Sequence, residues 1–197
     1  RRNSVIAMGD DGRVVGRADK VRLMPFGEYV PLYDVLPEEI QRRFSRGLVP
    51  GERPTTLSVA GATLGALNCY EDLFPDLSRA LVIAGADVLS NHTNDAWFLD
   101  TAAPHLHHFL ARLRSVETRR DLIRTVGTGV SGLVTATGEL EGTTSAWSRA
   151  TRLLRVRRLS GTTLWVRFGD LVTPSAAGAL LAAAVVTRRR RAKGAPP

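Results

Sequence analysis

Short apolar runs alternate with helix-like segments along most of the chain. Eight segments are predicted strands, and they comprise residues 4–8, 13–15, 56–59, 62–67, 88–90, 122–126, 132–136 and 163–167. Three segments are predicted helices, at residues 36–44, 76–82 and 101–120. Because strands and helices follow one another in this order, the pattern indicates an α/β layered domain, whose ligands tend to bind beyond the ends of the strands.

The segment of residues 101–120 has the clearest helical pattern in the chain. Its apolar residues recur at helical spacing, and they are Leu106, Phe109, Leu110, Leu113 and Val116. Arginine and glutamate occupy several of the remaining positions. This arrangement is typical of an amphipathic helix that packs one apolar stripe against a core.

The only cysteine, Cys69, stands between the predicted strand of residues 62–67 and the predicted helix of residues 76–82. A sulfur at the end of a strand can project from the edge of the sheet, where the dipoles of a following turn and helix favour the thiolate. The alternative is a small buried apolar residue, since free cysteine is often buried. Glu71 and Asp72 alone would disfavour the thiolate, so a nucleophilic role requires a cation from elsewhere in the chain.

Residues 17–32 supply a candidate cation. Pro25 and Pro31 bracket the core of this segment, which predicts a rigid loop and not a helix. Lys20 lies on the strand-like approach to the loop and Glu28 lies at its centre, so both could present charges to a cleft. The alternative is that both are ordinary surface charges.

A long uncharged run near the C-terminus predicts a membrane helix. Residues 171–187 carry no charge, and four arginines follow at residues 188–191. A spanning helix needs roughly 17–25 apolar residues, and a basic flank marks its cytoplasmic end. We therefore expect an outer domain of residues 1–168, a transmembrane helix of residues 169–187 and a basic cytoplasmic tail of residues 188–197. The alternative is a soluble alanine-rich helix with a basic tail.

The distribution of charge argues against a nucleic-acid partner. The formal net charge is +8. Residues 1–144 hold 16 Lys and Arg against 18 Asp and Glu, whereas residues 145–197 hold 11 against one. A nucleic-acid groove would spread its cations over the folded face, between aromatic residues, but here they flank an apolar segment. A single cysteine also excludes an internal disulfide.

Two local patterns lack the features of ligand sites. Residues 127–131 form a glycine-rich turn without the spacing of a phosphate-binding loop, and we interpret it as a place of close backbone packing. His105, His107 and His108 cannot all face one point on a helix, so no metal site is expected there. No cofactor is expected either.

Four segments in order resemble the carbon–nitrogen hydrolase (nitrilase) superfamily and, within it, the apolipoprotein N-acyltransferases. Residues 20–31 resemble the lysine segment, with the specific core Pro-Phe-Gly-Glu-Tyr-Val-Pro. Residues 69–71 resemble the nucleophile segment, residues 94–98 the loop typical of the acyltransferases, and residues 107–117 the helix that follows it. The resemblance implies a partial nitrilase-like α-β-β-α sandwich, without its N-terminal part, followed by a membrane helix.

The resemblance also implies roles for individual residues. Cys69 would be the nucleophile that takes an acyl chain as a thioester, and Lys20 would favour the thiolate and stabilise the oxyanion. Glu28 would be a supporting carboxylate near the lysine. The family's first glutamate, its general base, lies upstream of the lysine segment and has no counterpart in the printed residues.

The implied substrates are lipids and lipoproteins. The donor would be a phospholipid and the acceptor the N-terminal amine of a diacylglyceryl-cysteine apolipoprotein. Tyr70 and Glu71 would shape the substrate site beside the sulfur, and Trp97 would line the opening through which the lipid arrives. The implied location is the bacterial inner membrane, with the catalytic domain on the periplasmic side.

Two alternatives remain beside this acyltransferase. One is a soluble nitrilase-type amidase with the same glutamate, lysine and cysteine chemistry but with water as acceptor. The other is an inactive membrane-associated fragment that serves as a binding partner.

Overall fold

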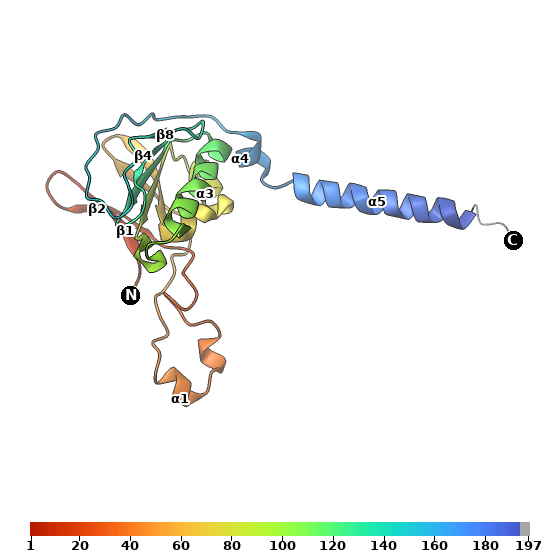
Figure 1. The fold of residues 1–197 in the computed structure, drawn as a ribbon, viewed down its shortest axis with the longest axis horizontal. Coiled ribbons are helices and arrows are strands. Elements are labelled where there is room, and N and C mark those ends of the chain that lie inside the picture. The colour runs from red at the N-terminus through yellow and green to blue at the C-terminus, as the bar shows by residue number, and fades with distance from the viewer. Residues whose placement is uncertain (194–197) are drawn as a thin grey trace.

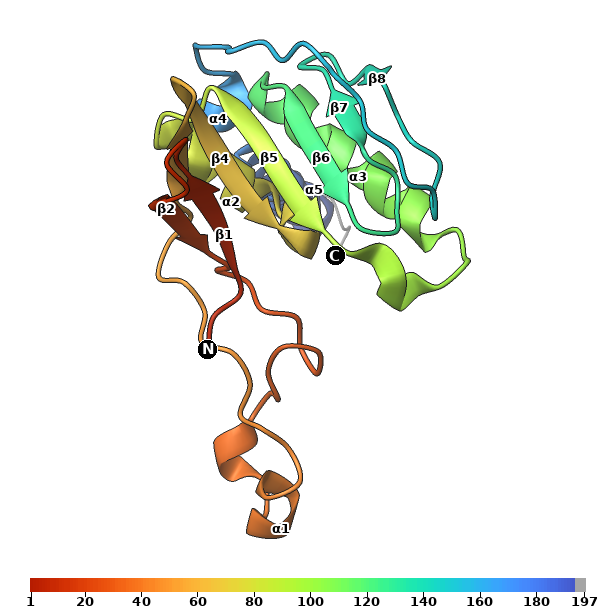
Figure 2. The ribbon, with the colours of Figure 1, turned by 90° about the vertical axis from the view of Figure 1, so that its left-hand side faces the viewer.

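The computed structural model describes residues 1–193. Its centre is a mixed sheet with the strand order β3-β4-β5-β6-β7-β8. The strands are β3 (Thr56–Val59), β4 (Ala62–Asn68), β5 (Val88–Thr93), β6 (Leu122–Val126), β7 (Gly132–Val134) and β8 (Leu140–Glu141). β4, β5 and β6 run parallel and the outer strands pair antiparallel, so the carboxyl ends of β4 and β5 meet at one edge (Figure 2).

Helices cover one face of this sheet (Figures 1 and 2). α2 (Pro75–Ile83) and α3 (Ala103–Thr118) lie in the crossovers between the parallel strands, and the short α4 (Leu164–Phe168) packs beside them. The core between helices and sheet is built of aliphatic residues that include Leu67, Leu81, Leu89, Leu122, Val134 and Val166. The α/β layered class is therefore confirmed.

An N-terminal hairpin forms a second, two-stranded sheet from β1 (Ser4–Met8) and β2 (Val14–Asp19). It docks on β3 and β4 through a small apolar cluster of Ala7, Ala18, Leu57 and Ala66. Small side chains allow the two sheets to approach closely. This contact places the end of β2, and with it Lys20, next to the end of β4.

α3 presents its apolar stripe to the outside, opposite to the expected arrangement. Leu106 and Phe109 are 57% and 55% exposed, and Leu113 and Val116 are exposed as well. The buried side of the helix instead consists of Pro104, His107, His108, Ala111, Arg114, Ser115 and Thr118. Proteins tolerate buried charged groups when they are paired, and His107 and Arg114 are both paired with carboxylates.

Residues between the lysine segment and β3 form an arm that projects from the body (Figure 1). The arm contains the 3-10 turn η1 (Tyr33–Val35) and the short α1 (Glu38–Gln41), which is the remnant of the helix expected at residues 36–44. Tyr29 closes its base by backbone bridges to Pro25 and Gly47. Gly47 has φ +104, and a Cβ there would collide with the carbonyl of Glu28, so only glycine fits this closure.

The C-terminal segment is helical where a strand was expected. Residues 164–168 form α4 and not a strand, because Thr163 caps the helix by accepting a hydrogen bond from the amide of Val166 and Val166 fills a place in the core. α5 (Val172–Lys193) is one helix that extends away from the body (Figure 1).

No helix within residues 1–193 is both long enough and apolar enough to cross a membrane. The transmembrane helix expected at residues 169–187 is therefore not supported, since its many alanines contribute little hydropathy. α5 also continues without a break into the basic tail expected at residues 188–197, whose last four residues lie outside the described part.

Candidate active site

The lysine expected to serve the site is buried and paired. Lys20 follows β2 and is 2% exposed. Its Nζ lies 2.7 Å from Oε2 of Glu28. Glu28 also accepts hydrogen bonds from the side-chain amide of Asn3 (2.8 Å) and the backbone amide of Met24 (2.8 Å). Burial opposes ionisation of Glu28, but these donors outweigh it and hold the pKa of its carboxyl below the usual value.

Cys69 begins a tight turn at the carboxyl end of β4. The 3-10 turn η2 (Cys69–Leu73) starts there, and Cys69 has the left-handed backbone conformation with φ 55°. This conformation is uncommon for a non-glycine residue and often occurs at functional sites. The side-chain amide of Asn91, on β5, donates to the carbonyl oxygen of Cys69 at 2.7 Å and holds the turn in place.

Glu71 joins the cysteine turn to the lysine segment. Its Oε1 accepts from the amides of Val21 (2.7 Å) and Arg22 (2.9 Å), and its Oε2 accepts from the amide of Asn68 (2.8 Å). Burial is the larger influence on Glu71 and raises the pKa of its carboxyl, although these amides and the Lys20 charge oppose the rise. One carboxylate thus connects two segments about fifty residues apart in sequence.

Tyr70 completes the same junction. Its hydroxyl donates to the carbonyl of Leu23 at 2.8 Å, and the Lys20 Nζ lies 4.9 Å from the centre of its ring. The structure therefore brings Lys20, Glu28, Tyr70 and Glu71 together around the turn that starts at Cys69. These residues were singled out from the sequence, and their catalytic roles are taken up as a proposal below.

Trp97 lies apart from this group. It belongs to η3 (Asp95–Phe98), beyond the end of β5, and is 81% exposed. It is not among the residues that line a groove, described below, beside the lysine segment. Its loop is connected to the cysteine turn indirectly, through a buried polar network.

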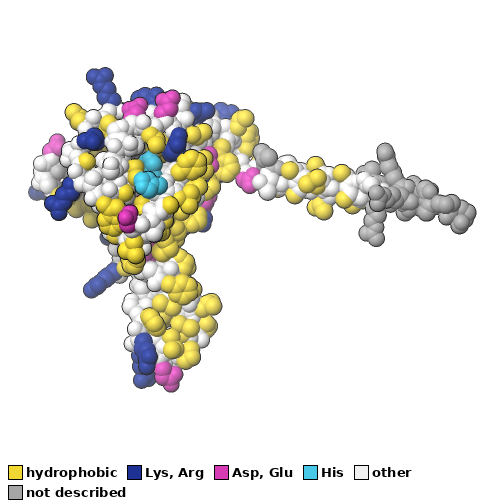
Figure 3. All heavy atoms as spheres, in the orientation of Figure 1, with side chains coloured by type: hydrophobic (Ala, Val, Ile, Leu, Met, Phe, Trp, Pro, Cys, Tyr) yellow, Lys and Arg dark blue, Asp and Glu magenta, His cyan; other side chains and the backbone are white. Residues whose placement is uncertain are grey.

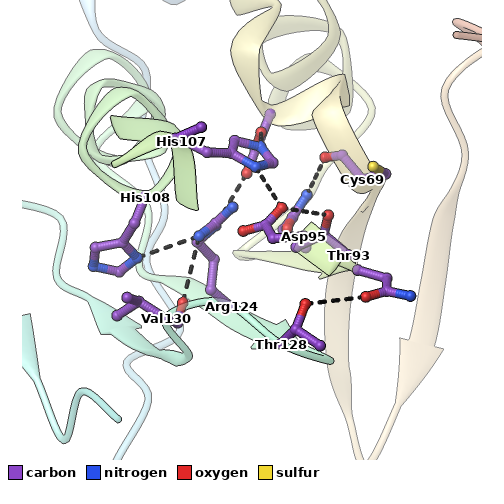
Figure 4. A network of polar contacts seen from close by, with 12 residues as sticks. Cys69, Thr93, Asp95, His107, His108, Arg124, Thr128 and Val130 are labelled. Carbon is purple, nitrogen blue, oxygen red and sulfur yellow. Dashed lines mark hydrogen bonds and ion pairs between the residues drawn. The ribbon is translucent and has the colours of Figure 1, made fainter. Parts of the chain in front are cut away.

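This network surrounds His107 of α3 (Figure 4). The Nε2 of His107 lies 2.8 Å from Asp72 Oδ1, and its Nδ1 lies 2.9 Å from Asp95 Oδ1. The Nε of Arg124, on β6, donates to Asp72 Oδ2 at 3.1 Å. The glycine-rich turn packs against the same site, because a Cβ on Gly129 would collide with Asp95 Oδ2. This confirms the interpretation of residues 127–131 as close backbone packing.

Of the two buried histidines, one is charged and the other is neutral at neutral pH. Burial alone would lower the pKa of His107, but its hydrogen bonds with Asp72 and Asp95 outweigh burial and raise the pKa to about 9. Burial, followed by the positive charge of Arg124, lowers the pKa of His108 to about 4. His107 is therefore an imidazolium and His108 a neutral imidazole.

This difference predicts a maximum in stability near pH 6.5. The folded pKa of His107 exceeds the ordinary value of about 6.5, so its contribution is complete below that pH and is lost as the pH rises through about 9. We expect a loss on the order of 2–3 kcal/mol across this window. His108 has the reverse effect, because only the unfolded chain takes up its proton between pH 6.5 and about 4.

Urea unfolding at pH values from 5 to 9.5 measures this profile. The variant His107→Gln should lose the alkaline decline, and His105→Gln, which alters an exposed histidine of the same helix, should keep it. A wild-type free energy of unfolding that stays constant from pH 6.5 to 9 contradicts the assigned charge states.

A groove with a volume of about 970 Å³ opens beside the cysteine turn. Its walls come from the lysine segment, the arm and the turn, and they include Leu23, Val30, Leu48, Tyr70 and Phe74. Tyr70 and Phe74 stack edge to face with ring centres 5.2 Å apart. The lining is mostly aliphatic and aromatic, which suits an apolar ligand.

Comparison with known families identifies the family of the chain. Residues 2–158 match the family Carbon-nitrogen hydrolase. The chain therefore belongs to the carbon–nitrogen hydrolase family, as its four sequence segments indicated.

Within this family the chain is similar to apolipoprotein N-acyltransferases. It is 37% identical over 172 residues to the apolipoprotein N-acyltransferase of Geobacter metallireducens, and 33% identical over 172 residues to that of Synechocystis sp.. Each alignment covers 86% of this chain and 33% of the relative, so the chain spans about a third of the length of these relatives.

Solved structures show the same architecture. A mutant of the amidase from Nesterenkonia sp. AN1 aligns with a TM-score of 0.51 at 26% identity, over 71% of this chain and 51% of that protein. That structure shows a Michael addition of acrylamide at the active-site cysteine of the amidase. A carbon–nitrogen hydrolase from Helicobacter pylori G27 aligns with a TM-score of 0.56 at 19% identity, over 73% and 52% of the two chains, and shares the fold.

Sequence reasoning missed the network around His107. The three neighbouring histidines were considered only as possible metal ligands, and Asp72 only as a charge beside the cysteine. A signal was present, because polar residues at positions 107, 108, 114, 115 and 118 recur at helical spacing as regularly as the apolar ones. Deciding which stripe faces the sheet required the partners on η2, η3 and β6.

Proposed function

We propose that this chain carries the nucleophile of an acyltransferase that moves a fatty acyl chain from a phospholipid to the N-terminal amine of diacylglyceryl-cysteine apolipoproteins. The observation that carries the proposal is the junction at Glu71, which holds the buried Lys20–Glu28 pair against the turn of Cys69. The similarity to apolipoprotein N-acyltransferases supports the choice of substrates. The apolar groove beside the turn supports a lipid donor.

The first step forms a thioester. The Cys69 sulfur attacks the ester carbonyl of the phospholipid, and Lys20 stabilises the negative oxygen of the tetrahedral intermediate. The carbon–oxygen bond to the glycerol then breaks, and the thiol proton ends on the departing alkoxide, which leaves as a lysophospholipid. Glu28 and Tyr70 fix the Lys20 ammonium in place.

The second step transfers the acyl group to the acceptor. The α-amine attacks the thioester carbonyl, an amide bond forms, the carbon–sulfur bond breaks and a proton from the nitrogen returns to the sulfur. A thiolate is a good leaving group, so the residues described need no nucleotide to drive either step.

The group that carries the proton between these steps is neither Glu28 nor Glu71. Each of these carboxylates already accepts three hydrogen bonds. The donors to Glu28 are Lys20, Asn3 and the amide of Met24, and all three donors to Glu71 are backbone amides. Their oxygens are occupied in holding the site together. The resemblance assigns the general base to a glutamate upstream of the lysine segment.

The arm is the part of the molecule that we propose faces the bilayer, on the outer side of the bacterial inner membrane. Large apolar side chains of the arm are exposed, and they include Leu32, Val35 and Phe44 (Figure 3). Leu32 and Val35 also line the groove. Apolar side chains therefore lead from the arm to the groove, beside the exposed ion pairs Glu38–Arg42 and Asp34–Arg46 of the arm.

The direct test supplies the donor alone and then the acceptor. The intact gene product is incubated with a phospholipid of known acyl composition, and the peptide containing Cys69 is analysed by mass spectrometry. We expect the mass of one acyl chain, removable by neutral hydroxylamine, and its transfer to a diacylglyceryl-cysteine peptide with a free amine. An acyl-enzyme that hydrolyses while the amine stays unmodified, or turnover of small amides only, would favour the amidase alternative.

Leu32→Asp should separate lipid delivery from chemistry. The charge lies on the arm and in the wall of the groove, so we expect transfer from phospholipid vesicles to fall about tenfold or more. Hydrolysis or transfer of a soluble short-chain ester should stay within about twofold, because the nucleophile is untouched. Val15→Asp, which changes an exposed residue of β2, is the matched control. Equal losses with both substrates would contradict a role in lipid delivery.

A further inference from the structure

A buried cluster of four charged side chains lies beside Cys69 and includes one residue of the cysteine turn (Figure 4). It consists of Asp72 on η2, Asp95 on η3, His107 on α3 and Arg124 on β6. All four are buried. The mechanism above uses none of them, and none lines the groove.

The charges of this cluster balance only when His107 is protonated. The two carboxylates then face two cations, Arg124 and the imidazolium. His108, the other titratable group in contact, faces Arg124 through its Nδ1 at 3.3 Å and is neutral. Uncharged His107 would leave one buried carboxylate without a positive partner, an arrangement that proteins avoid.

His107 is the only one of the four that contacts both loops beyond the strand ends. Its Nε2 binds Asp72, three residues after Cys69, and its Nδ1 binds Asp95, at the start of the turn that carries Trp97. Arg124 strengthens only the first of these contacts, through Asp72 Oδ2. The left-handed backbone of Cys69 needs such support, since surrounding structure must hold an unfavourable conformation in place.

We propose that His107 is a positioning residue for the nucleophile: its imidazolium fastens the turn of Cys69 to the loop of residues 94–98, so that the two adopt their working geometry together. The inference rests on the proposed function for the role of Cys69 as a nucleophile. It concerns the geometry of Cys69 and not the identity of the substrate. The imidazolium does not touch the reacting atoms. Its effect reaches the sulfur through Asp72 and the intervening backbone of η2.

The test measures the sulfur without any lipid. Alkylation of Cys69 by iodoacetamide is followed from pH 6 to 10 in the wild type and in His107→Gln. We expect the variant to react about 10- to 100-fold more slowly at neutral pH, since small displacements of a positioned nucleophile have effects of this size. Hydrogen exchange should increase in residues 69–73 and 94–98 together, while the strands β5 and β6 keep their protection.

A second variant restores the charge balance. In His107→Gln combined with Asp95→Asn, one carboxylate and one cation remain, Asp72 and Arg124, and amides can bridge the former positions of the imidazole and carboxylate. We expect this double variant to recover at least half of the lost alkylation rate on a logarithmic scale. A merely structural histidine predicts no such recovery, because the double variant removes a second buried contact.

Two matched controls lie on the same helix. His108→Gln changes a buried neighbour that touches neither carboxylate, and His105→Gln changes an exposed one. Both should alkylate within about threefold of wild type. A loss in His108→Gln equal to that in His107→Gln would overturn the proposal, since it would show a general response to core substitution.

A measurement on the wild type decides the matter even if His107→Gln fails to fold. Above pH 9, where His107 loses its proton, exchange corrected for its intrinsic rate should rise in residues 69–73 and 94–98 before the rest of the chain. Uniform exchange in all segments overturns the proposal. Normal dependence on His107 without any acyl transfer from phospholipid would instead refute the proposed function and leave the positioning role intact.

Discussion

Cys69→Ala should abolish formation of the acyl-enzyme and lower acyl transfer by about 10⁴-fold or more, as expected when a covalent nucleophile is removed. The fold should survive, because Cys69 is only partly buried and the turn is held through backbone and neighbouring side chains. Alanine must adopt the same left-handed conformation, so we expect a stability change below about 1.5 kcal/mol.

The measurement is mass spectrometry of the intact protein after incubation with phospholipid, combined with transfer to the amine peptide. Cys69→Ser is a useful companion, since an acyl-serine ester would resist neutral hydroxylamine and would identify the attacking position. Acylation of Cys69→Ala at another residue would show that the sulfur is not the nucleophile.

Lys20→Met should have the second largest effect. We expect acyl transfer to fall about 10²- to 10³-fold, the size seen when one group that stabilises an oxyanion is lost. Removing one partner of a buried ion pair also destabilises the fold. We expect a loss of only about 2–4 kcal/mol, because Glu28 keeps its hydrogen bonds from Asn3 and Met24. Alkylation of Cys69 by iodoacetamide at neutral pH should slow as well.

The double variant Lys20→Met with Glu28→Gln separates catalysis from stability. It replaces the buried ion pair by neutral groups of similar size, so much of the lost stability should return while the activity stays low. Glu28→Gln alone keeps the lysine and should have the milder catalytic effect. If the double variant alkylates and transfers like wild type, the ammonium has no role in activating the sulfur.

The sequence allowed the hairpin that delivers Cys69 to be predicted closely. The strands of residues 56–59 and 62–67 correspond to β3 and β4, with the turn at Ala60 and Gly61, because alternating side chains and a glycine turn are local signals. The pairing of Lys20 with Glu28 could be anticipated only as two charges on one loop. Their distance depends on how the loop folds, with Glu28 held by hydrogen bonds from Asn3 and the amide of Met24, and these contacts leave no local pattern in the sequence.

Other elements could not be predicted because local pattern and burial disagree. The apolar stripe of α3 satisfies the rule for a core-facing helix, yet the buried side is the one that can pair Asp72, Asp95 and Glu117 with its own histidine and arginine. Residues 164–168 have the composition of a short strand, but the hydroxyl of Thr163 caps a helical turn there. Tertiary contacts decided both cases.

The carboxylate of Glu71 has a consequence for the order in which the molecule matures. Its contacts with Val21 and Arg22 span about fifty positions, so they can form only once the segments between them have been brought together. Until then the ammonium of Lys20 has no fixed place beside the sulfur. Any reactivity that the ammonium confers on Cys69, as proposed above, would then belong to the finished fold and not to the newly made chain.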